Sequence, residues 1–270
     1  MKILILCNKS PWPKREGGPI AMHAMISGLL QAGNAVIVIA ANTNKYTVDP
    51  DTIPSAFKEK TQIEFVDIDL TLSVTGALFN VLSGKSYHVT RFHTKAFEQK
   101  IIEVLRNETF DIIQLETLQM SSYLDVIHKY SKAPVVLRAH NIEHKIWQRV
   151  AENCPNPIKR IYLNQLYRSL KRFEISILNK IDGIVAITPV DARNLDRLSH
   201  STNIISIPFG INLDSLPENP VQPEEASLFH IGTMNWFPNE ESIRWLLSEV
   251  WPVISKKLPE IELHLAGRYM

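Results

Sequence analysis

Short apolar runs alternate along the chain with stretches in which apolar residues recur at helical spacing. Residues 3–6 form an uninterrupted apolar run, which is typical of a parallel strand buried on both faces. Ala21, Met25, Leu29 and Ala32 then recur with the period of a helix, and a second apolar run follows at 35–40. Strand, helix and strand within forty residues predict a right-handed βαβ unit.

The same alternation continues through most of the chain. Apolar runs predict further strands at 63–68, 112–115, 134–138, 183–187 and 204–207, and apolar stripes predict helices around 97–105, 120–127 and 166–181. Thr188 is expected to cap one more helix, with Pro189 at its first position. Regular alternation of this kind predicts an α/β fold with a mostly parallel sheet.

A change of composition at 208–226 predicts a boundary between two domains. Four prolines and three glutamates lie in this stretch, as in an interdomain linker. Residues 1–207 then form a first domain, and the order of strand, helix and strand restarts at 227–270. Since a unit of about 40 residues is too small to bury a core of its own, we expect 227–270 to be the start of a truncated second domain.

Charge and cysteine content narrow the class of protein. The net charge of +1 gives no reason to expect a nucleic-acid partner. No run reaches the ~18 apolar residues of a membrane-spanning helix, and the first apolar run is too short for a signal peptide, so a cytoplasmic location is expected. Cys7 and Cys154 suit neither a disulfide framework nor a zinc site, and no metal or other cofactor is expected.

Two pairs of residues stand where an open α/β sheet binds its ligands, after the carboxyl end of a strand. Gly17 and Gly18 follow the first strand, and Gly232 and Thr233 follow the strand predicted at 228–231. Each pair precedes a helix, whose first backbone N–H groups favour an anion. Two such loops on two domains suggest a ligand held in a cleft between them.

Two ionisable residues also follow strands. His140 comes after the strand at 134–138 and is either a structural hydrogen-bonding residue or a functional one. Its spacing to His144 is a weak zinc signal, because the order of residues differs from the helical zinc motif. Glu116 ends the strand at 112–115, where a carboxylate either binds sugar hydroxyls or caps the next helix.

Two stretches of the chain are basic. Residues 158–180 hold six basic residues against one acidic residue, and this face is either a solvated helix surface or a site attracted to anionic lipid. Residues 84–100 include Arg91 and would steer an acceptor that bears a phosphate. Neither stretch is interpreted as a site for single-stranded nucleic acid.

Several segments, taken in order, resemble the glycosyltransferases of family 4. They are the loop with Gly17 and Gly18 and the stretches 110–116, 138–144, 182–188, 207–212 and 229–239. The resemblance implies the GT-B architecture, in which two Rossmann-like domains bind the acceptor and the nucleotide respectively. It implies a retaining, metal-independent transfer of a sugar from a nucleotide-sugar to a polysaccharide or lipid-linked acceptor, at the inner face of the membrane or in the cytoplasm.

The resemblance also implies roles for individual residues. His140 is expected to contact the donor sugar at the reaction centre. Backbone N–H groups and cations near the departing diphosphate would stabilise its growing negative charge without a metal. The other residues with an implied role are Gly17, Gly18, Gly232, Thr233 and Arg268, all on the donor side. Glu116 and Arg91 are the candidates on the acceptor side, from the strand end and the basic stretch described above. Arg268 either reaches the nucleotide or is an exposed arginine near the chain end.

The sequence departs from the family pattern in three places. Ala21 stands where an arginine is common, and Phe209 and Asn212 replace an amide and an acid in the interdomain crossover. The family's two glutamates separated by seven residues belong further along the second domain. The pairs Glu241 with Glu249 and Glu108 with Glu116 have that spacing in other contexts. We therefore expect the 270 residues to have little activity by themselves.

Two other functions remain open from the sequence. One is a sugar-nucleotide epimerase of GT-B fold, which would release an altered sugar without an acceptor. The other is a non-catalytic acceptor-binding module that pairs with a separate donor domain. A nicotinamide-dependent dehydrogenase is disfavoured, because the first loop lacks the glycine fingerprint for a dinucleotide.

Overall fold

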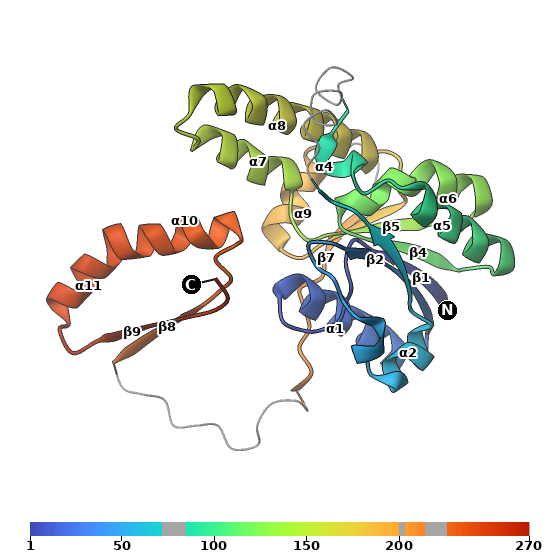
Figure 1. Ribbon diagram of the computed structural model, residues 1–270, viewed down its shortest axis with the longest axis horizontal. Coiled ribbons are helices and arrows are strands. Elements are labelled where there is room, and N and C mark those ends of the chain that lie inside the picture. Colours follow the sequence, from blue (N-terminus) through green and yellow to red (C-terminus); the bar gives the residue numbers. More distant parts are fainter. Residues whose placement is uncertain (72–84, 200–202, 214–225, 270) are drawn as a thin grey trace. The chain divides into compact units, whose positions relative to one another are not determined.

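The computed structural model describes residues 1–71, 85–199, 203–213 and 226–269 (Figure 1). Contacts between residues divide the chain into two compact units, Met1–Ile211 and Asn212–Met270. Most of the predicted linker at 208–226 lies outside the described residues.

The first unit is built on a parallel sheet of seven strands in the order β3-β2-β1-β4-β5-β6-β7. The strands are β1 (Lys2–Cys7), β2 (Ala35–Thr43), β3 (Glu64–Ile68), β4 (Ile112–Glu116), β5 (Val135–Ala139), β6 (Gly183–Ala186) and β7 (Asn203–Ser206). Every strand predicted for this part of the chain is present, with its ends shifted by a few residues. The predicted parallel α/β architecture is therefore confirmed.

Helices cover both faces of this sheet (Figure 1). They are α1 (Gly17–Gln31), α2 (Ser55–Thr61), α4 (Tyr87–Thr90), α5 (Lys95–Asn107), α6 (Leu124–Tyr130), α7 (Glu143–Glu152), α8 (Pro157–Leu178) and α9 (Pro189–Asp196), with 3₁₀ turns η1 (Pro50–Thr52) and η2 (Leu118–Tyr123). Side chains alternate along β1, so that Ile5 packs with Met22 of α1 on one face and Leu4 packs in the larger core on the other. Both faces are apolar because both are covered.

The ends of two helices bear on the sequence predictions. The side chain of Thr188 accepts a hydrogen bond from the backbone N–H of Asp191 at 3.0 Å, so the predicted cap of α9 is confirmed. The stripe predicted to continue to Ile181 is too long, since α8 ends at Leu178. Ile181 is nevertheless buried in the main core, in the turn that leads to β6. Its burial explains why it extended the apolar pattern beyond the helix.

The second unit contains the predicted order of strand, helix and strand. The strands β8 (Ser227–Ile231) and β9 (Glu262–Ala266) pair in parallel, and the helical segment between them consists of α10 (Phe237–Trp245), a π-helical turn (Leu246–Val250) and α11 (Trp251–Lys257). Several large apolar side chains of this unit are exposed, including Phe229, Ile231 and Trp245. In the described part of the chain, no helix has both the length and the apolar character needed to cross a membrane.

Candidate functional site

The carboxyl ends of β1, β4 and β5 lie side by side at the edge of the sheet where the strand order reverses. From β1 the chain moves outward through β2 to β3, and it then returns to the other side of β1 to form β4. Open α/β sheets bind their ligands at such a switch point. Gly17 and His140 lie in the segments that follow β1 and β5, and Glu116 is the last residue of β4.

Glu116, the last residue of β4, is fully buried and holds His140 in place. Its Oε2 lies 2.6 Å from Nε2 of His140. Its Oε1 accepts hydrogen bonds from Gln114 at 2.7 Å and from Nη1 of Arg138 at 3.4 Å. Arg138 is only 1% exposed, and Nη1 also donates to the backbone carbonyl of Ala21 at 3.1 Å. A buried arginine, a glutamate and a histidine are thus linked in series.

The charge state of Glu116 fixes the proton on His140. Burial alone would raise the pKa of the Glu116 carboxyl, but the hydrogen bond from His140 and the charge of Arg138 outweigh it and hold the pKa below its ordinary value. An ionised carboxylate can only accept, so Nε2 of His140 carries the hydrogen that it donates. In neutral His140 the free lone pair is therefore on Nδ1.

The His140 ring is enclosed on one side by Phe209. The two rings meet edge to face with centroids 5.7 Å apart, and the Arg138 guanidinium lies 5.2 Å from the centroid of Phe209. His140 is 9% exposed, and Nδ1 has no hydrogen bond to any residue that the structure describes. The imidazole is therefore fixed in orientation with one nitrogen left for a ligand.

The sequence left two roles open for Glu116, binding of sugar hydroxyls or capping of the next helix, and its contacts in the structure bear on both. The first turn of η2 has no side-chain cap, so Glu116 does not cap the segment that follows it. Both carboxylate oxygens are bonded to protein groups, and the side chain has no exposed surface. This geometry favours a role in positioning His140 over the predicted contact with an acceptor.

His144 does not join His140 in a metal site. Its Nδ1 lies 2.6 Å from Oε2 of Glu174 on α8, and this oxygen also accepts the backbone N–H of His144 at 3.0 Å. Oε1 of Glu174 accepts the backbone N–H of Glu143 at 3.1 Å. Glu174 thus satisfies the first amides of α7, which lacks a side-chain cap of its own. Among the described residues, no three side chains of the metal-binding types gather.

The glycine loop opens α1 with free space at its first residue. A Cβ on Gly17 would have no neighbouring atom within 4 Å, whereas a Cβ on Gly18 would lie 2.8 Å from Cε of Lys9. Nζ of Lys9 is 3.3 Å from Oε2 of Glu16 and 4.6 Å from the centroid of the Tyr46 ring. Glu16 makes no side-chain cap to the helix. The N-terminus of α1 therefore offers backbone N–H groups and a nearby cation to an anion.

Arg91, predicted on the acceptor side, follows α4. It is half-buried, and its guanidinium lies 5.6 Å from the centroid of the Phe92 ring. Burial lowers the pKa of the guanidinium, and its Nε is buried with no hydrogen-bond partner among the described residues. No ion pair joins Arg91 to a carboxylate in the described part of the chain, Glu116 included.

The predicted donor residues Gly232, Thr233 and Arg268 belong to the second unit, where they meet at the carboxyl ends of β8 and β9. The N–H of Gly232 donates to the carbonyl of Ala266 at 3.0 Å, and the N–H of Met234 donates to the carbonyl of Arg268 at 2.9 Å. The side chain of Thr233 donates to that of Asn235 at 2.8 Å. Their roles in donor binding stay predictions.

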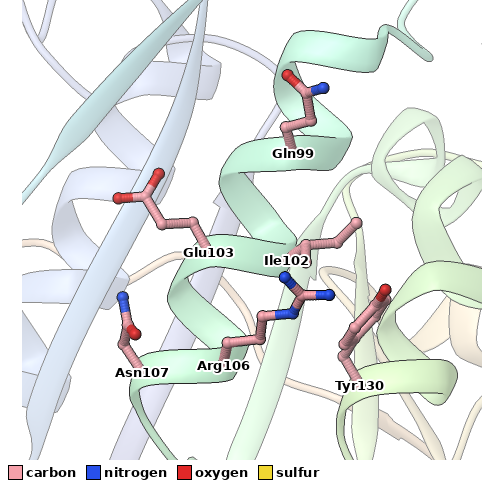
Figure 2. Close-up of a pocket in the computed structure, with 6 residues that line it drawn as sticks. All are labelled: Gln99, Ile102, Glu103, Arg106, Asn107 and Tyr130. Carbon is pink, nitrogen blue, oxygen red and sulfur yellow. The ribbon is translucent and has the colours of Figure 1, made fainter.

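A cavity of about 410 Å³ lies elsewhere on the first unit and is lined by Gln99, Ile102, Glu103, Arg106, Asn107 and Tyr130 (Figure 2). Five of these residues belong to α5, and Tyr130 ends α6. The C-terminal end of α5 leads into β4, so this cavity lies toward the amino edge of the sheet. None of the predicted site residues lines it, and we do not assign it to the reaction.

Several members of the network could not be predicted from the sequence. Arg138 carries a charge inside an otherwise apolar strand, and that contrast was the available signal. Glu174 was counted as one acid among many basic residues of a helix surface, although it is buried. Gln114 gave no signal, since its contact with Glu116 depends on the pleat of β4.

Solved structures with the same architecture define the class of this protein. Medicago truncatula UGT71G1 complexed with UDP-glucose is 14% identical, with a TM-score of 0.57, and the match covers 100% of this chain and 67% of that chain. Sucrose-phosphate synthase from Thermosynechococcus elongatus is 14% identical, with a TM-score of 0.58, and covers 99% and 71%. S. aureus TarM in complex with Fondaparinux, alpha-GlcNAc-glycerol and UDP is 12% identical, with a TM-score of 0.57, and covers 99% and 72%. At these identities the likeness shows the fold, which is that of the GT-B glycosyltransferases.

The family follows from the sequence profile of Glycosyltransferase Family 4, which matches residues 16–215. The chain therefore belongs to glycosyltransferase family 4, and the predictions of the GT-B fold and of this family are confirmed. A comparison with curated protein sequences found no match.

Proposed function

We propose that this glycosyltransferase moves a sugar from a nucleotide-sugar to a polysaccharide or lipid-linked acceptor, with retention and without a metal. The observation that carries the proposal is the fixed His140 at the switch point of the sheet, held by Glu116 at 2.6 Å. Structures of the same fold with UDP-glucose or UDP bound support a nucleotide-sugar as the donor.

The groups at this edge suit the charge that develops in the transfer. As the bond to the diphosphate breaks, the diphosphate gains negative charge and the sugar gains positive charge. The N–H groups that open α1 at Gly17, together with Lys9, would stabilise the diphosphate, since they are already oriented. Nδ1 of His140 would accept a hydrogen bond from a sugar hydroxyl. Gly232, Thr233 and Arg268 remain the proposed donor contacts of the second unit.

The test uses the whole chain with UDP-glucose, UDP-N-acetylglucosamine, GDP-mannose and ADP-glucose as probes. We expect at least one of them to bind in a calorimetric titration and to release its nucleoside diphosphate in the presence of a chelator. The anomeric proton coupling of the product should match that of the donor. If no probe binds, the proposal is wrong; if the chelator abolishes turnover, metal independence is wrong.

The same assay separates the remaining alternatives. Release of an altered free sugar without any acceptor would favour an epimerase. Binding of acceptor with no binding of nucleotide-sugar would favour a binding module. Low turnover by the 270 residues alone stays a prediction, which this assay also measures.

We also propose that α8 contacts an anionic membrane surface at the cytoplasmic face, through the basic stretch 158–180. Ile158 and Ile161, one turn apart near the start of α8, are 80% and 73% exposed. An exposed apolar pair among basic residues suits the boundary of an anionic bilayer, where each basic residue contributes about 1 kcal/mol.

Sedimentation with vesicles tests this contact. The chain should bind vesicles that contain phosphatidylglycerol and not those of phosphatidylcholine alone, and binding should weaken with salt. The double variant Ile158→Ser with Ile161→Ser should bind several-fold less. Val190→Ser is the matched control, since Val190 is an exposed apolar residue of α9. Equal binding to both kinds of vesicle would exclude the contact.

A further inference from the structure

A second polar cluster lies three residues beyond the pair of Glu116 and His140, on the same two segments. Gln119 follows Glu116 by three residues, and Glu143 follows His140 by three residues. His88 of α4 joins them: its Nε2 is 2.7 Å from Nε2 of Gln119 and 3.3 Å from Oε2 of Glu143. Because β4 and β5 are neighbouring strands, this cluster adjoins the reaction centre at the same edge of the sheet.

One nitrogen of His88 cannot satisfy both of its neighbours. When Nε2 accepts from the Gln119 amide, the Glu143 carboxylate lacks a donor. When Nε2 carries a hydrogen and donates to Glu143, the Gln119 amide nitrogen lacks an acceptor. The amide oxygen of Gln119 is also buried and has no partner among the residues that the structure describes, and the side chain is only 5% exposed. Buried polar groups are otherwise almost always paired, so the cluster is incomplete without a ligand or water.

Taken over the two states, the missing partner has to donate to an oxygen of Glu143 or Gln119 and to accept from the amide nitrogen of Gln119. A hydroxyl group does both: it can donate to the Glu143 carboxylate and accept from the Gln119 amide. A phosphate or carboxylate ligand only accepts, and the charge of Glu143 would repel it. The cluster therefore favours a neutral ligand that carries hydroxyl groups.

An aromatic ring borders the cluster. Trp147 lies one turn after Glu143 on α7, and its ring meets that of His88 edge to face, with centroids 5.4 Å apart. The indole is only partly buried. Trp147 also packs against the core, and its ring borders the polar cluster at His88. An aromatic ring next to polar groups matches the two kinds of surface on a sugar ring, its apolar C–H groups and its hydroxyls.

We propose that His88, Gln119 and Glu143, with Trp147 beside them, form a subsite for a neutral sugar unit of the acceptor. This rests on the proposed transfer to a glycan or lipid-linked acceptor and narrows it: the part of the acceptor next to the reaction centre is an uncharged sugar. Arg91 directly follows α4, the helix that carries His88, and would bind any phosphate further along the same acceptor.

Saturation-transfer NMR with the whole chain tests the subsite. The probes are the methyl glycosides of glucose, galactose, mannose and N-acetylglucosamine, with inorganic phosphate as the anionic comparison. We expect at least one neutral glycoside to bind. Its affinity should fall about tenfold in Glu143→Gln, which keeps the shape and removes the charged acceptor, and by a similar factor in Gln119→Ala.

Glu98→Gln is the matched control. Glu98 on α5 also pairs with a histidine, with its Oε2 3.4 Å from Nε2 of His93, and no contact joins it to His88, Gln119 or Glu143 in the described part of the chain. The Glu98→Gln variant should bind the glycoside with the affinity of the unchanged chain. The proposal is overturned if no neutral glycoside binds, if phosphate alone binds, or if Glu143→Gln and Gln119→Ala bind as the unchanged chain does.

A parallel titration with the nucleotide-sugar probes keeps the two proposals apart. If a nucleotide-sugar binds and no glycoside does, the subsite is wrong and the proposed function stands. If glycosides bind in the predicted way and no nucleotide-sugar does, the subsite stands and sugar transfer by this chain does not.

Discussion

Two histidines four residues apart, His140 and His144, are each held by a glutamate at 2.6 Å, yet the two pairs are built for different tasks. Glu116 receives only side-chain hydrogen bonds, and it sits between buried Arg138 and a histidine with an unoccupied nitrogen. Glu174 instead receives two backbone N–H groups at the start of α7 in addition to His144. His144 is almost fully enclosed.

The difference shows how neighbouring residues of one type divide between chemistry and structure. In the pair of Glu174 and His144, the carboxylate also accepts backbone amides and so stabilises the start of a helix. In the pair of Glu116 and His140, the carboxylate binds side chains and so fixes the tautomer and ring orientation of the histidine. The distance between the two partners is the same in both, so the remaining contacts of the carboxylate decide the role.

The largest expected effect comes from removing the carboxylate of the first pair. Glu116→Ala leaves the charge of Arg138 buried without its partner, which should cost about 3–5 kcal/mol of the free energy of unfolding. Urea unfolding measures this. Glu116→Gln keeps the shape and should lose less. A loss below about 1 kcal/mol for Glu116→Ala would show that Arg138 does not depend on Glu116.

Removing each histidine in turn should separate the two roles. His140→Ala should lower the rate of nucleotide-sugar turnover per folded molecule about 100-fold, which corresponds to about 2.7 kcal/mol in the barrier. Both His140→Ala and His144→Ala break a buried hydrogen bond to a glutamate and should lower stability, but His144→Ala should leave turnover per folded molecule unchanged. The turnover assay and urea unfolding are run on both variants. Equal loss of turnover in the two would contradict the division.

Glu174→Gln sharpens the comparison at the second pair. The amide keeps one acceptor oxygen and turns an NH₂ group toward a donor, so about 1.5–3 kcal/mol of stability should be lost, as for hydrogen bonds to a charged group. Turnover per folded molecule should stay unchanged. Asp191→Asn on α9 serves for comparison, since that carboxylate is also at a helix start but only partly buried. Asp191→Asn should lose less stability than Glu174→Gln.

The smallest expected effect is a pH dependence that belongs to the first pair. The pKa of Glu116 lies below its ordinary value of 4.5 in the folded chain, because His140 and Arg138 outweigh the effect of burial. Its ionised form therefore stabilises the folded state above that pH, and this contribution is lost as the pH falls through the lowered pKa. The stability difference between the unchanged chain and Glu116→Gln should shrink below pH 4.5. If the stability difference instead grows below pH 4.5, the pKa of Glu116 is raised in the folded chain and not lowered.

The strands of both units could be predicted from the sequence because each is a short, nearly continuous apolar run. Helices α2, α4 and α7 could not. Helix α4 spans only Tyr87–Thr90, and the apolar side of α7 is short, with Trp147, Val150 and Ala151 packed in or against the core. Polarity alone does not reveal that Glu174 lies inside the molecule.

The candidate site was predictable only in part, because its contacts join elements that are distant in the sequence. His140 and Glu116 stood out because they follow strands. Their contact depends on β4 and β5 being neighbours, which is a property of the strand order. His88 follows no strand, and its place between Gln119 and Glu143 arises from a contact between α4 and η2 that no local pattern encodes.

The length of α8 sets the distance between its exposed first turns and the buried Glu174. Sixteen residues separate the exposed Ile158 from Glu174, which is about 24 Å along the helix axis at 1.5 Å per residue. Glu174 in turn fixes the first amides of α7, just after the segment that carries His140. Contact at the Ile158 end of α8 would thus be linked to the segment that carries His140 through one continuous helix. Insertion of seven residues, close to two helical turns, between Ile158 and Glu174 would lengthen this separation by about 10.5 Å along the helix axis and leave the exposed side of the helix nearly in line.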